Sequence, residues 1–138
     1  MAVLTQYQWD PSLETGNELI DGQHKEWMKV LNSIIDAHKQ GKGRDEIMKT
    51  MDFLSDYTLL HFSAEEKLMA DSDYPEYSIH KRYHEELKET MKNLTKKYAR
   101  EVSPDDFISI VIYTLGDWLF SHIKGDDFRM AAYIRSKS

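Results

Sequence analysis

Apolar side chains recur at three- and four-residue steps over most of the chain, which is the period of an amphipathic α-helix. The first residues, 1–17, show no sustained period, so we expect an arm packed across the domain. The pattern predicts four long helices and one short C-terminal helix, over about residues 18–39, 44–70, 76–100, 104–124 and 126–134. Such helices joined by short turns predict an all-α, up-down-up-down four-helix bundle.

Two connections carry recognisable helix-start signals. Ser103-Pro104 offers a capping hydroxyl followed by proline at the first helical position, with acidic residues in the first turn. The segment 71–75 is a turn by composition, and we expect one of its Asp or Ser side chains to cap the following helix. Gly125 is predicted to end or redirect the fourth helix.

Length and composition restrict the class of protein. The 138 residues suit one domain over 1–138, and the net charge of −6 argues against nucleic-acid or anionic-membrane partners. The absence of cysteine excludes disulfides and thiolate metal sites. We see neither a signal peptide nor a membrane-spanning run, and we expect a cytoplasmic protein.

Ionisable side chains interrupt the apolar stripes of the second and third predicted helices. His61 and Glu65 are four residues apart, as are His80 and His84, so each pair lies on one helix face. An unpaired imidazole or carboxylate buried there would cost several kcal/mol. Two such pairs on adjacent antiparallel helices predict half of a dinuclear metal site.

The helix ends place more donors at the same level. His24 lies near the start of the first helix and His122 near the end of the fourth, so five histidines fall at one end of the bundle. His38 follows His24 by fourteen residues, roughly 21 Å along a helix. We therefore expect His38 to be a partly buried or rim histidine outside the site.

The donor types restrict the metal. Imidazole and carboxylate without thiolate suit iron, zinc, manganese or copper. The set is too large for one tetrahedral zinc, which favours two octahedral-type centres bridged by carboxylates. One carboxylate stays open at this point, because Asp126 follows His122 by four residues, the helical spacing, and Asp127 follows it by five.

The chain resembles the hemerythrin family, specifically its bacterial members. The resemblance covers most of the chain and rests on these residues: Trp9-Asp10, 20–25, His61-Phe62 with Glu65, Tyr74-Pro75, His80, His84, and 118–123 with Asp127. It implies a non-haem di-iron site with an oxo or hydroxo bridge. The implied metal ligands are His24 and His61 on one iron, His80, His84 and His122 on the other, and Glu65 and Asp127 between them. It thus selects Asp127, with Gly125 allowing the chain to bend.

The resemblance also implies an apolar oxygen pocket beside the iron that has an open position. The candidate walls are Phe62, Trp118, Leu119 and Ile123. Trp27 stands where the family often has leucine, and Leu87 where phenylalanine is common. We expect Trp27 to be a further wall. The larger side chain at position 27 and the smaller one at position 87 are expected either to compensate in volume or to alter access to the pocket and the rate of autoxidation.

The implied function is reversible binding of dioxygen, for storage, delivery or sensing. The alternatives are a di-iron enzyme acting on peroxide or nitric oxide, and iron storage or delivery. No general acid or base is evident beyond the ligands, which argues against the enzyme, and seven fixed ligands argue against easy iron release. A signalling domain is expected as a partner only if the chain is a fragment of a larger receptor.

Overall fold

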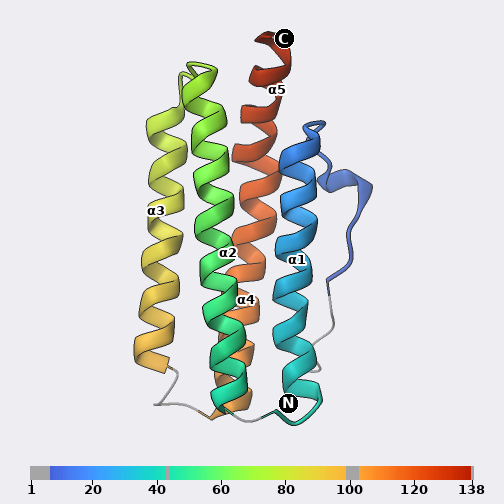
Figure 1. The fold of residues 1–138 in the computed structure, drawn as a ribbon, viewed down its shortest axis with the longest axis vertical. Helices are drawn as coiled ribbons and strands as arrows, with labels where there is room; N and C mark the ends of the chain where they lie inside the picture. The colour runs from blue at the N-terminus through green and yellow to red at the C-terminus, as the bar shows by residue number, and fades with distance from the viewer. Residues whose placement is uncertain (1–6, 43, 99–102, 138) are drawn as a thin grey trace.

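The computed structural model describes residues 7–42, 44–98 and 103–137, and this part of the chain contains helices and no strand. The α-helices are α1 (Glu18–Lys39), α2 (Arg44–Asp71), α3 (Tyr77–Asn93), α4 (Pro104–His122) and α5 (Phe128–Lys137). The four long helices stand side by side and alternate in direction, and α5 continues the path of α4 beside the neighbouring ends of α1 and α2 (Figure 1). The predicted four-helix bundle is confirmed.

Two short π-helical segments continue α-helices. One is η2 (Leu94–Tyr98) after α3, and the other is η3 (Ile123–Asp127) between α4 and α5. The expectation that Gly125 ends or redirects the helix is wrong, because Pro104 to Lys137 is one continuous helical path. Gly125 is absent from the glycines with positive φ, so no special backbone conformation bends the chain there.

Local capping confirms the predicted start of α4 and departs from the prediction at the start of α3. The Ser103 hydroxyl accepts a hydrogen bond from the Asp106 N–H at 3.2 Å, with Pro104 at the start of α4. Asn17 caps α1 in the same way, through Ile20 N–H at 3.1 Å. The expected Asp or Ser cap on α3 is wrong. Its N-cap is Glu76, which makes no side-chain capping bond.

The N-terminal arm, in its described part, packs on the bundle through a three-residue 3₁₀ turn, η1 (Pro11–Leu13), and through Tyr7. The Tyr7 N–H donates to Asn32 Oδ1, and Asn32 Nδ2 donates back to the Tyr7 carbonyl, both at 2.8 Å. The Tyr7 hydroxyl donates to the Ile112 carbonyl at 3.2 Å. The arm thus crosses from α1 to α4, while residues 1–6 lie outside the described part.

The core divides into two apolar clusters. The large one fills the bundle and includes Trp27, Phe62 and Ile123. The small one, at the α5 end, includes Ile20 and Met69. The predicted metal ligands are buried together with both clusters. In the described part of the chain, no helix combines the length and apolar character needed to cross a membrane.

Candidate metal centre

Seven buried donors meet at one level of the bundle, supplied by α1, α2, α3, α4 and the η3 segment. They form two overlapping groups, and the ligand atoms within each group lie within 4.8 Å of one another. Glu65 and Asp127 belong to both groups. The histidines divide unequally, with His80, His84 and His122 in one group and His24 and His61 in the other. The structure therefore brings together all seven predicted donors.

Glu65 lies between the two groups and offers one oxygen to each. Its Oε1 is 3.0 Å from His84 Nε2 and 3.4 Å from His80 Nε2. Its Oε2 is 3.0 Å from His61 Nε2 and 3.4 Å from His24 Nε2. A carboxylate that points one oxygen at each of two donor sets has the arrangement needed to bridge two cations.

Asp127 repeats this division from the opposite helix. Its Oδ1 is 3.0 Å from His80 Nε2 and 3.1 Å from His122 Nε2. Its Oδ2 is 2.8 Å from His24 Nε2. The two carboxylates agree on the same partition of the histidines, although they come from elements 62 residues apart in sequence. This partition divides the donors into two adjacent sets, each of which could hold a metal ion.

Several donor atoms at the cluster's centre have no hydrogen-bond partner within the described structure. They are the Nε2 atoms of His24, His61 and His80, Oε2 of Glu65 and both carboxylate oxygens of Asp127. Buried polar atoms without partners are costly and rare, so a group of them facing one point calls for a common partner. Metal cations satisfy nitrogen and carboxylate oxygen donors at once, and the residues present fit them.

Without metal, protons would neutralise the cluster. Burial lowers the pKa of His24, but its contacts with Asp127 and Glu65 outweigh this effect and raise that pKa to about 9. Burial raises the pKa of Glu65, but the charge on His61 and the close imidazoles of His122 and His24 hold it well below its ordinary value. Cations that bind here must displace protons from imidazoles, so metal binding is expected to release protons.

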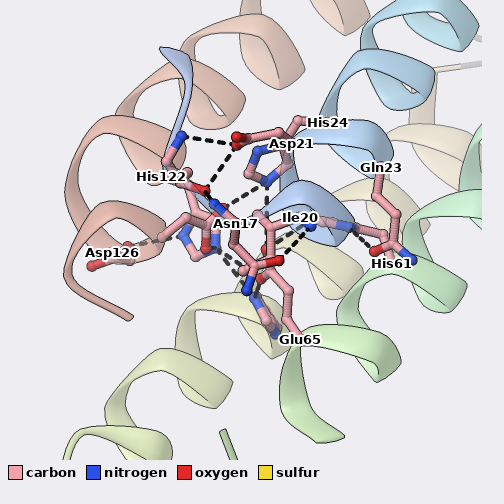
Figure 2. A network of polar contacts seen from close by, with 12 residues as sticks. Asn17, Ile20, Asp21, Gln23, His24, His61, Glu65, His122 and Asp126 are labelled. Carbon is pink, nitrogen blue, oxygen red and sulfur yellow. Dashed lines mark hydrogen bonds and ion pairs between the residues drawn. The ribbon is translucent and has the colours of Figure 1, made fainter. Parts of the chain in front are cut away.

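Three of the five histidines are oriented by an acceptor at their other ring nitrogen. With Nε2 left free for a metal, each Nδ1–H donates to a side-chain oxygen. The pairs are His61 with Gln23 Oε1 at 2.7 Å, His84 with Glu66 Oε2 at 2.9 Å, and His122 with Asp126 Oδ2 at 2.9 Å. Figure 2 shows Gln23 beside His61, and Asp126 on the outer side of His122.

The π-helical segment explains why two consecutive aspartates reach the same histidine. In an α-helix, a residue five positions on lies about 140° around the axis from the first. A π-turn closes with one more residue, so Asp127 turns inward onto His122 Nε2, while Asp126 reaches the ring's other nitrogen. The spacing from His122 could not decide between Asp126 and Asp127, because both side chains contact the His122 ring.

Sequence reasoning missed Gln23 and Glu66 as orienting residues. Each precedes or follows a predicted ligand by one position, yet adjacency gives no information about which way a side chain points on a helix. Asp126 had a usable signal, since it follows His122 at helical spacing. An i, i+4 acidic residue beside a ligand histidine could have been predicted as its orienting partner.

An aromatic layer covers one side of the cluster. Phe62 stacks on the His84 ring with centroids 3.8 Å apart, and Trp118 stacks on the His122 ring at 4.3 Å. Trp27 lies 5.3 Å from the His61 ring and also contacts Phe62 and Trp118. The layer therefore touches histidines of both groups.

The remaining predicted pocket walls are buried in the same part of the core. Leu119 and Ile123 belong to the large apolar cluster, and so does Leu87. Trp27 and Leu87 both pack into this one continuous core. His38 lies outside the site, where its Nε2 pairs with Asp105 Oδ1 at 3.1 Å on a partly exposed surface.

Comparison with known proteins gives an independent result. The family model described as the hemerythrin HHE cation binding domain matches residues 15–134. A bacteriohemerythrin from Pseudomonas aeruginosa is 36% identical over 119 residues, covering 86% of this chain and 75% of that protein. A myohemerythrin from Theromyzon tessulatum is 28% identical over 123 residues, with 89% of each chain covered.

A solved structure extends the likeness to three dimensions. The crystal structure of a wild-type hemerythrin superposes with a TM-score of 0.80 and 29% identity, covering 94% of this chain and 98% of that one. The matched region contains every donor of the two groups, from His24 to Asp127. The chain belongs to the hemerythrin family.

Proposed function

We propose that this protein binds dioxygen reversibly at a non-haem di-iron centre. The observation that carries the proposal is the unequal partition of histidines around two shared carboxylates. One group has three imidazoles and the other has two, and both share Glu65 and Asp127. The group with two imidazoles therefore has one donor fewer. That group has a coordination position to offer to an external ligand.

The chain's own residues would hold each metal in a different way. His80, His84 and His122 would complete the coordination of one iron together with the two carboxylates. His24 and His61 would hold the other iron, at which the ligand binds. Two ferrous ions held there would supply the two electrons that dioxygen takes up on binding. Gln23, Glu66 and Asp126 would keep the imidazole rings oriented through their Nδ1–H groups.

The surroundings favour reversible binding over turnover. The aromatic layer of Trp27, Phe62 and Trp118 would exclude water and protons from the open side, and so protect the bound ligand from release as peroxide. In the described part of the cluster, each titratable side chain is either a donor or a partner of a donor. A reaction that needs a separate acid or base has no obvious group there.

Metal analysis of the purified protein tests the proposed centre. We expect two irons per chain and no strongly bound third metal. A single zinc per chain would contradict both the di-iron centre and the function built on it.

The absence of cysteine suits a reducing compartment, and we place the protein in the cytoplasm as part of this proposal.

A further inference from the structure

A small cavity between α3 and the start of α5 reaches one donor of the cluster from outside. It is lined by Tyr74, Glu76, Ile79, His80, Asp126 and Arg129. His80 is the donor, and its side chain is only 2% exposed. His80 is the one cluster donor in this lining. The seam between α3 and α5 therefore brings a cavity up to the edge of the centre.

One arginine holds the mouth of this cavity closed. Arg129 Nη2 donates to Asp126 Oδ1 at 2.5 Å, and its Nε lies 3.7 Å from Glu76 Oε2. The Tyr74 hydroxyl also donates to Glu76 Oε2, at 3.1 Å, which fixes that carboxylate at the rim. Arg129 thus links a residue at the start of α3 to the aspartate that orients His122.

The closed cavity is too small to admit a hydrated cation. Its volume of about 10 Å³ is close to the minimum that accommodates one water. A divalent cation in solution carries a shell of several waters, so it can pass only if Arg129 moves and other oxygens replace those waters. Arg129 and Glu76 are 58% and 50% exposed, and an ion pair so exposed is weak, whereas Asp126 is 18% exposed. Movement of Arg129 therefore has mainly its bond to Asp126 to break.

Movement of Arg129 would leave two carboxylates facing the opening. Glu76 and Asp126 would then present free oxygens to a cation, with the His80 imidazole directly behind them. His80 lines this cavity and directs its Nε2 at Asp127 Oδ1, 3.0 Å away, so its ring stands between the opening and the rest of the cluster. The arrangement forms a path of donors from the surface to the cluster.

We propose that Glu76 and Asp126 form an access site for a divalent cation, which Arg129 covers and from which metal passes to His80. The cation takes the place of the arginine's positive charge between the same two carboxylates. This inference rests on the proposed metal centre, but it concerns the route of the metal and not the final coordination. It assigns to Arg129 and Glu76 a role in loading, without a role in holding the bound metal.

The test uses protein loaded with Co²⁺, whose visible absorption reports binding without reaction with dioxygen. Release to excess chelator gives a rate, and competition at equilibrium gives an affinity. Arg129→Ala is expected to speed release about tenfold with affinity unchanged, because a barrier on the path alters uptake and release equally. An unchanged release rate, or faster release with a matching loss of affinity, would overturn the proposal, since the latter indicates a structural role through Asp126 and His122.

A second variant separates the carboxylate from the arginine. In protein that already carries Arg129→Ala, no arginine covers the cavity. Adding Glu76→Gln there should slow release several-fold at unchanged affinity, because it removes a carboxylate from the path. Arg129→Lys should restore part of the slow release. Lys88→Gln is the matched control, because it breaks an exposed ion pair with Glu85 at 3.0 Å away from the cavity, and it should leave release unchanged.

The outcomes distinguish failure of the path from failure of the centre. Wild-type protein that binds fewer than two Co²⁺ per chain would count against the proposed centre. Wild-type protein that binds two Co²⁺, with Arg129→Ala and Lys88→Gln releasing them at the same rate, would refute the access site alone.

Discussion

Asp127 lies five residues after His122 and yet points one oxygen at its Nε2, at 3.1 Å, because the chain between them forms a π-turn. The extra residue in that turn also frees Asp126 to accept a hydrogen bond from the same ring at Nδ1. One local departure from α-helical geometry therefore supplies both a bridging carboxylate and the residue that orients its neighbour. The centre depends on the length of this turn.

The π-turn can be tested by changing residue 125. Gly125→Ala should retain two metals, because the added Cβ meets nothing closer than Arg129 Nη1 at 3.7 Å. It should also stabilise the helix by about 0.5–1 kcal/mol. Deletion of Gly125 should abolish dinuclear binding, since losing one residue rotates Asp127 by about 100° on the helix. Metal content and urea unfolding measure both effects, and two tightly bound metals in the deletion variant would contradict this account.

Glu65 and Glu66 can be compared directly, because Glu65 faces both metal positions whereas Glu66 contacts only the outer nitrogen of His84. Glu65→Gln removes an anionic oxygen shared by both metal positions, so no more than one metal should remain bound. Glu66→Gln keeps an acceptor for the His84 Nδ1–H and should retain two metals with affinity lower by about tenfold. Metal titration followed by optical spectroscopy distinguishes them. Equal loss in the two variants would argue against a bridging role for Glu65.

His61 and His38 provide a second matched pair, now among histidines. His61→Ala removes one of only two imidazoles from its half of the cluster, and metal content should fall to about one per chain. His38→Ala breaks only a partly exposed contact with Asp105, so metal content should stay at two. Iron analysis after identical reconstitution measures this, and a comparable loss of iron from both variants would refute the ligand set.

The metal-free protein should lose stability as pH rises from neutral. The pKa of His24 is raised in the fold from 6.5 to about 9, so its protonated form favours the folded state. That contribution is complete below pH 6.5 and lost through pH 9, a decline on the order of 3 kcal/mol. Urea unfolding with a chelator present should show the decline. Metal-loaded protein should lack it, because metal replaces the proton, and a flat profile for metal-free protein would contradict the charge network.

The sequence predicted the bundle well because its signal is repetitive. Each long helix carries many apolar positions at helical spacing, so errors at single residues cancel. The shared level of five histidines followed from the same regularity, because antiparallel helices fix which ends lie together. The lengths of α3 and α5 were less accurate, since fraying and π-turns depend on a few local hydrogen bonds.

The parts that the sequence did not predict are departures from α-helical geometry and contacts between helices. The η3 segment has no recognised sequence signal, so Gly125 was interpreted as a bend. Gln23 and Glu66 act across to His61 and His84 on neighbouring helices, which spacing along one helix cannot reveal. The resemblance predicted Trp27, Phe62 and Trp118 as walls of one pocket, but it did not predict the ring contacts by which they join three helices.

Reversible dioxygen binding is tested most directly by stopped-flow spectroscopy of the reduced, iron-loaded protein mixed with oxygenated buffer. We expect rapid formation of a stable oxygenated species that returns to the reduced state under argon over repeated cycles. Rapid oxidation to a di-ferric form that argon does not reverse, with turnover of peroxide, would contradict the account.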